Sequence, residues 1–154
     1  MKSNGISVSK NTLHDYLIYI EDVFLVFSIS LYSESLRKVQ TTPRKIYAVD
    51  SGLYYAYTSS FSKNLGRVFE NFIYLTLRRA SREVFYYVTK NGYEVDFLAK
   101  SLNGDRILYQ VVWEADDSQT LAREQRALDE AKSELGIDGK IVTLKNYLTK
   151  LDLD

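Results

Sequence analysis

The sequence has 154 residues, a formal net charge of zero and 45% apolar residues. This composition suits one folded domain with a small appendage and argues against disorder over most of the chain. The chain contains no cysteine, which excludes disulfides and thiolate metal sites. It has no apolar run of the roughly 18 residues that cross a bilayer, which excludes a membrane span. Together these features predict a cytoplasmic protein.

The first predicted elements are an amphipathic helix and a two-stranded ribbon. Ser9 is a candidate N-cap, and apolar residues then recur at helical spacing as far as Asp22. Residues 23–32 predict a strand, residues 33–42 a polar loop and residues 43–49 a second strand. His14, the only histidine, lies on the polar side of the helix, so no catalytic triad or histidine zinc site can be assembled.

A helix followed by a ribbon is the second half of a winged helix, a DNA-binding module. Basic residues exceed acidic ones in residues 1–113, and acidic residues exceed basic ones in residues 114–154. The candidate nucleic-acid contacts are Lys10, Arg37, Lys38, Arg44, Lys45 and, further along the chain, Lys90. The first two helices of a winged helix are missing before Ser9, so we favour the interpretation that residues 1–50 form an arm that packs on the main domain or on a second copy of the chain, giving a dimer.

Residues 64–80 predict the most regular helix, with a wide apolar stripe between Leu65 and Leu77. Glu70 lies at the margin of this stripe. A carboxylate there is either a solvated edge residue or a ligand that points into a site, and spacing alone favours the solvated edge.

Residues 84–113 predict three short strands joined by turns at Asn91–Gly92 and at residues 101–105. A two-residue Asn91–Gly92 loop places Tyr87 opposite Asp96. Asp96 and Gln110 lie inside these strands, and burying either one unpaired costs roughly 1–3 kcal/mol. We therefore expect them to hold a divalent metal or to have a hydrogen-bonded structural role.

The remaining residues complete an α/β pattern. An acidic loop over residues 114–119 precedes a helix over residues 120–135, which Gly136 caps, and a strand over residues 140–144 precedes a polar tail. Helix, three strands, helix and strand predict a mixed central sheet flanked by helices. We divide the chain into a partial winged-helix arm, residues 1–50, and an α/β domain, residues 51–154.

Several stretches carry a family resemblance: GRVFENFIYLTLRR, FYYVTKNGYEVDFLAK and LYQVVW. They resemble the C-terminal domain of archaeal and bacterial AAA-type ATPases, in which an ATPase module and a winged helix precede a restriction-endonuclease-like domain of the PD-(D/E)xK type. The resemblance runs from about Ser9 to Leu144. It does not include the ATPase module, so we expect no ATPase activity from this chain.

The resemblance implies a nuclease core in which Glu70, Asp96 and Gln110 form the catalytic and Mg²⁺-binding positions. The lysine that follows two residues after the Glu/Gln position is replaced by Val112. We therefore expect a non-catalytic or weakly active endonuclease-like domain that binds DNA or a protein partner such as an ATPase module. The alternatives are a Mg²⁺-dependent nuclease with a relocated lysine and a dimerisation module that binds no nucleic acid.

Overall fold

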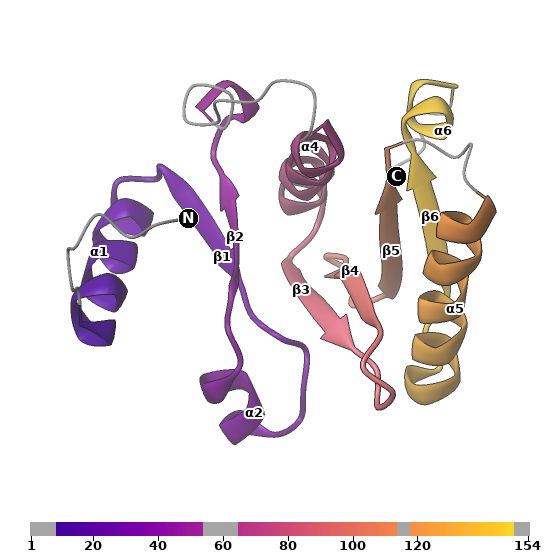
Figure 1. Cartoon of the computed structure of the whole chain (residues 1–154), viewed down its shortest axis with the longest axis horizontal. Helices are drawn as coiled ribbons and strands as arrows, with labels where there is room; N and C mark the ends of the chain where they lie inside the picture. The colour runs from indigo at the N-terminus through magenta and orange to yellow at the C-terminus, as the bar shows by residue number, and fades with distance from the viewer. Residues whose placement is uncertain (1–8, 54–64, 114–117, 150–154) are drawn as a thin grey trace.

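The computed structural model describes residues 9–53, 65–113 and 118–149, and it contains a four-stranded mixed sheet flanked by helices (Figure 1). The strands, in their order across the sheet, are β3 (Glu83–Val88), β4 (Glu94–Lys100), β5 (Arg106–Val112) and β6 (Gly139–Thr143). Neighbouring strands are antiparallel except β5 and β6, which are parallel. The predicted mixed α/β fold is therefore confirmed.

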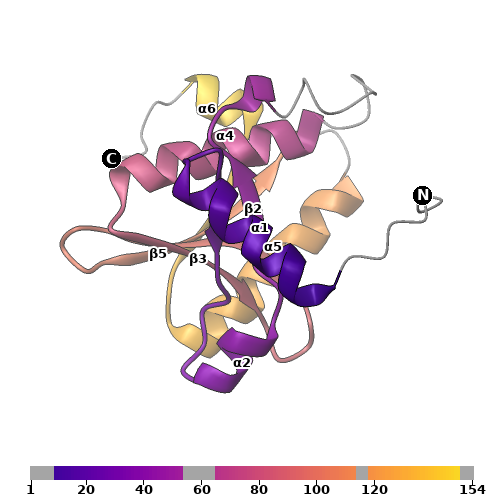
Figure 2. The same cartoon turned by 90° about the vertical axis from the view of Figure 1, so that its left-hand side faces the viewer.

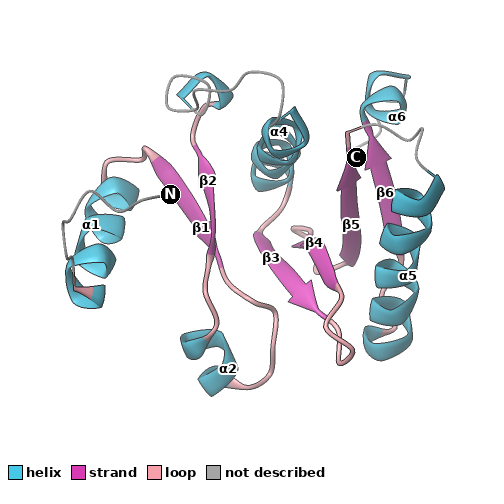
Figure 3. Ribbon diagram, viewed as in Figure 1, coloured by secondary structure: helices cyan, strands magenta, loops and turns pink. Residues whose placement is uncertain are grey.

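One helix covers each face of the sheet (Figure 3). α4 (Leu65–Ala80) buries Phe69, Ile73 and Leu77, which recur every fourth residue, against one face. α5 (Ser118–Leu135) buries Leu128 and its small neighbours against the other face. Both helices lie where the sequence predicts them, and no helix in the described ranges is long and apolar enough to cross a membrane.

The N-terminal unit contains α1 (Lys10–Asp22), β1 (Val26–Ile29), α2 (Leu36–Thr41) and β2 (Lys45–Ala48). Ser9 caps α1 as predicted, since its side chain accepts a hydrogen bond from the backbone N–H of Thr12. The polar loop expected over residues 33–42 is wrong in part: Ser35 caps the short helix α2 there. The polar tail is also wrong in part, because Leu144–Thr149 forms the helix α6.

The ribbon of β1 and β2 is fastened to the edge of the sheet (Figure 2). Beyond β1, the backbone of Tyr86 on β3 accepts from Tyr32 N at 2.8 Å and donates to Ser30 O at 3.2 Å. The side chain of Asn71 on α4 bonds both the N–H and the carbonyl of Ala48, at 2.7 and 3.1 Å. These bonds hold β2 beside α4 and the face of the sheet that α4 covers.

The hairpin between β3 and β4 differs from the predicted two-residue loop. Thr89 N donates to Tyr93 O at 2.9 Å, so the loop has one more residue, and Gly92 takes a φ of 86°. Tyr87 consequently pairs with Val95 and not with Asp96. The second turn is confirmed, with Ser101 N bonded to Asp105 O.

Candidate functional site

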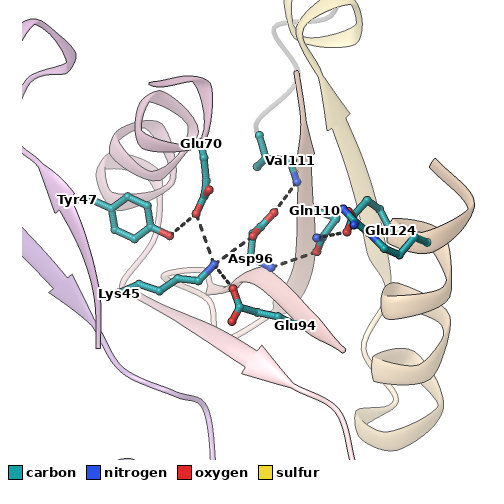
Figure 4. Close-up of polar contacts among 9 residues, drawn as sticks. Lys45, Tyr47, Glu70, Glu94, Asp96, Gln110, Val111 and Glu124 are labelled. Atoms are coloured by element: carbon teal, nitrogen blue, oxygen red, sulfur yellow. Dashed lines mark hydrogen bonds and ion pairs between the residues drawn. The ribbon is translucent and has the colours of Figure 1, made fainter. Parts of the chain in front are cut away.

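A β-bulge in β4 directs the side chain of Asp96. The register shifts by one residue between two pairs of partners, Phe85 with Leu98 and Tyr87 with Val95. The extra residue on β4 breaks the alternation of its side chains: Val95 joins the core under α5, whereas Phe97 joins the core under α4. A bulge re-aims side chains in this way. It turns the carboxylate of Asp96 towards α4 and the ribbon (Figure 4).

The ammonium group of Lys45, on β2, lies among three carboxylates (Figure 4). Its Nζ atom is 3.1 Å from Asp96 Oδ1, 3.5 Å from Glu70 Oε1 and 2.7 Å from Glu94 Oε1. The Lys45 side chain is only 21% exposed. We refer to Lys45, Glu70, Glu94 and Asp96 as the lysine–carboxylate cluster.

Tyr47 holds the Glu70 side of the cluster in place. Its hydroxyl group donates to Glu70 Oε1 at 2.8 Å, and its ring stacks on Tyr74 with centroids 4.3 Å apart. Burial, followed by the charge of Glu70 and the hydrogen bond to it, raises the pKa of Tyr47 above its ordinary range. Tyr47 therefore stays a neutral donor to the carboxylate at any physiological pH.

The charges of the cluster depend on one another. Burial raises the pKa of Asp96 to about 6, because the opposing effect of Lys45 is smaller and Glu70 adds repulsion. Burial lowers the pKa of Lys45, but the charges of Asp96 and Glu70, with Glu94, outweigh it and the net shift is upward. Lys45 is thus always charged, and Asp96 titrates within reach of neutral pH.

Gln110 makes its hydrogen bonds on the α5 side of the sheet, away from the cluster. Its side-chain oxygen accepts from Asp96 N at 3.1 Å, and its Nε2 donates to Glu124 Oε2 on α5 at 2.5 Å. Meanwhile Val111 N donates to Asp96 Oδ2 at 3.0 Å (Figure 4). Gln110 thus satisfies the backbone N–H of the bulge residue, which corresponds to the structural role expected as an alternative to metal binding.

The three predicted metal ligands do not come together around one point. Glu70 and Asp96 both contact the Lys45 ammonium, whereas both polar atoms of the Gln110 amide have other partners. Val112 is buried and supplies no charge. Within the described ranges no three His, Cys, Asp or Glu side chains are grouped to hold a metal ion. As arranged, these residues do not fit a Mg²⁺ site.

The predicted nucleic-acid contacts are dispersed. Arg44 bonds Ser28 Oγ at 3.4 Å, Arg37 is exposed on α2, and the side chain of Lys10 lies outside the described part of the chain. Lys38 and Lys90 instead line one cavity of about 760 Å³, together with Arg106 and with residues of the β1–β2 connection, the end of β3 and the end of α5. Arg106 is a further candidate nucleic-acid contact, and the sequence alone did not indicate it.

The sequence reasoning also missed that Lys45 joins the acids, and with it Tyr47 and Glu94. The signal was present in β2, where Lys45 and Tyr47 alternate with exposed Ile46. A lysine on the inner face of a buried strand needs carboxylate partners.

Comparison with known proteins gives two family matches and one relative. Residues 65–150 match a domain of unknown function, DUF4143, and residues 2–64 match another, DUF8612. The uncharacterized protein MJ1544 of Methanocaldococcus jannaschii is 32% identical over an alignment of 149 residues, which covers 93% of this chain and 32% of the relative. The chain thus spans about a third of the length of that protein. No solved structure matches the chain.

Proposed function

The chain belongs to the DUF4143 family, whose members are commonly found at the C-terminus of AAA-type ATPases, and from this premise we propose that it is a non-cleaving, endonuclease-like binding domain that serves such an ATPase. The observation that carries the proposal is the position of the Lys45 ammonium, within 3.5 Å of three carboxylates. A metal cation bound by both Glu70 and Asp96 would have to displace this ammonium group.

Two further features support a core that kept its shape without its chemistry. Gln110 is engaged by Asp96 N and Glu124, so its oxygen is committed to the fold. The buried side chain of Val112 offers neither a proton nor a positive charge. Neither Gln110 nor Val112 can therefore activate a water molecule or stabilise the charge that develops on the phosphate during cleavage.

The ligand we propose is DNA, bound through its phosphates. Lys38, Lys90 and Arg106 line one cavity and present positive charge from α2, the β3–β4 turn and the start of β5. Basic side chains that contact phosphates give binding without sequence preference and with a strong dependence on salt. Two carboxylates also line this cavity: Glu134, which is already bonded to Tyr87 and to the backbone of Lys90, and Glu34, which is exposed.

The test is fluorescence anisotropy of a labelled DNA duplex with the intact chain at several salt concentrations. The double variant Lys38→Glu and Lys90→Glu should weaken binding at least tenfold and flatten its salt dependence. Lys145→Glu, at an exposed lysine on α6, is the control and should change little. Equal affinity in all three proteins, or no binding by the unaltered chain, would refute DNA as the ligand.

A second candidate function, cleavage with Lys45 as the relocated lysine, is favoured by its 3.1 Å distance from Asp96. This candidate requires the ammonium to move, because it now fills the space between the carboxylates. Plasmid cleavage in Mg²⁺ or Mn²⁺ that disappears in both Lys45→Met and Asp96→Ala would select it. Cleavage that persists in both variants would indicate a contaminating nuclease.

A further inference from the structure

The outward side of α1 is an uncovered apolar face. It consists of Leu13, Tyr16, Tyr19, Ile20 and Val23, each more than a third exposed. At 100° per residue these side chains share one sector of the helix. α1 is the outermost element of the N-terminal unit (Figures 1 and 2), and the exposure of these five side chains shows that the described elements leave this sector largely uncovered. We call these five residues the α1 face; clusters of this kind mark interaction sites on soluble proteins.

A strained residue extends the α1 face at its C-terminal end. Phe24 has a φ of 57° and is 66% exposed. Its N–H bonds Glu21 O, and the N–H of Leu25 bonds Ile20 O, so the turn that ends the helix fixes this conformation. A left-handed conformation is strained for a bulky residue because its Cβ lies too close to the following carbonyl oxygen, a contact that glycine avoids. An aromatic side chain held out to solvent under strain indicates a role that the isolated fold does not need.

The charge beside the α1 face is acidic. Asp15 and Asp22 lie four residues before and three residues after Tyr19, so they form one flank of the face. Both are exposed. Apart from Lys10, whose side chain lies outside the described part, α1 contains no lysine or arginine. A complementary surface must therefore be apolar with basic residues along its edge.

A second copy of the chain fits the α1 face poorly. Two α1 helices that pair antiparallel about a two-fold axis bring each flank against the same flank of the partner. Asp15 and Asp22 of one copy would then face Asp15 and Asp22 of the other, and juxtaposed like charges are unfavourable. The dimer expected from the sequence is therefore the competing occupant and not the favoured one.

We propose that the α1 face, together with Phe24, docks an amphipathic helix of another polypeptide whose apolar side is flanked by lysine or arginine. Leu13, Tyr16, Ile20 and Val23 bury its apolar side, and Asp15 and Asp22 pair with its basic flank. This site is separate from the cavity lined by Lys38, Lys90 and Arg106 and from the lysine–carboxylate cluster, and it does not depend on DNA binding.

The test uses two labelled 14-residue helical peptides, one of leucine and lysine and one of leucine and glutamate in the same amphipathic pattern. Fluorescence anisotropy with the intact chain should detect binding of the lysine peptide only. Tyr16→Ser with Tyr19→Ser should weaken it at least tenfold. Leu148→Ser, at an apolar residue 71% exposed on α6, is the matched control and should leave it unchanged.

Two further variants separate docking from nonspecific adhesion. Asp15→Lys with Asp22→Lys should reverse the preference, so that the glutamate peptide binds. Phe24→Gly should raise the melting temperature, because it removes strain, and yet weaken peptide binding. Equal binding of both peptides, an unchanged preference after the charge reversal, or a dimer in sedimentation equilibrium that Tyr19→Ser dissociates would overturn the proposal.

Discussion

Replacing Lys45 with methionine tests the lysine–carboxylate cluster as a source of stability. Methionine keeps much of the length and apolar volume of the side chain and removes the charge. The pKa of Asp96 rises from 3.8 to about 6 even with Lys45 beside it. That rise means that the folded protein disfavours the charged carboxylate by about 3 kcal/mol. Without Lys45 this cost increases.

Breaking a buried ion pair by removing one partner costs about 3–5 kcal/mol. Lys45 is 21% exposed and Glu94 is 52% exposed, so water screens part of the interaction. We therefore expect Lys45→Met to lower the free energy of unfolding by about 2–3 kcal/mol at pH 8. Lys145→Met, at an exposed lysine, should change it by less than about 0.5 kcal/mol.

The loss should shrink in acid. A carboxyl group whose pKa is raised by folding stabilises the folded protein below its unfolded pKa, and this contribution disappears as pH rises through the folded pKa. For Asp96 that window runs from 3.8 to about 6, and in Lys45→Met it extends higher. Urea denaturation at pH 5 and pH 8 measures the difference. A loss that is the same at both values, or no loss at pH 8, would refute the ion pairing.

Gly139→Ala, with Gly66→Ala as its control, tests the packing between α5 and the sheet, and Gln110→Glu tests the role of Gln110. A Cβ atom on Gly139 would lie 2.8 Å from Leu128 Cδ2, so Gly139→Ala should lower stability by about 1–2 kcal/mol in thermal unfolding. Gly66→Ala, which meets nothing closer than 3.9 Å in a helix, should be neutral or stabilising. Gln110→Glu sets a carboxylate against Glu124, so it should destabilise the protein at pH 8 but much less at pH 5. Urea denaturation at the two pH values measures the loss. An equal loss of stability at both pH values would contradict the structural role of Gln110.

The elements that sequence reasoning predicted well have strong local causes. The apolar stripe of α4, the Ser9 cap and the glycine of the second turn each act within a few residues, so their effects can be recognised without tertiary contacts. The short helices α2 and α6 were missed because six polar-rich residues show too little periodicity.

The site was harder to predict because its geometry depends on distant parts of the chain. The bulge at Asp96 decides which face its carboxylate occupies, and a regular strand pattern gives no sign of it. Lys45 lies 51 residues before Asp96 in the sequence, and it was interpreted as a DNA contact. Spacing alone placed Glu70 at a solvated edge, although the ribbon covers it and Tyr47 bonds it.

The most direct test of the lysine–carboxylate cluster is calorimetric titration of Mn²⁺ into the unaltered chain and into Asp96→Ala. Since the Lys45 ammonium already occupies the space between Glu70, Glu94 and Asp96, we expect no saturable binding at millimolar Mn²⁺ in either protein. Saturable binding to the unaltered chain that Asp96→Ala abolishes would contradict this expectation. It would mean that the ammonium yields its place to a metal and that the core kept its catalytic cation site.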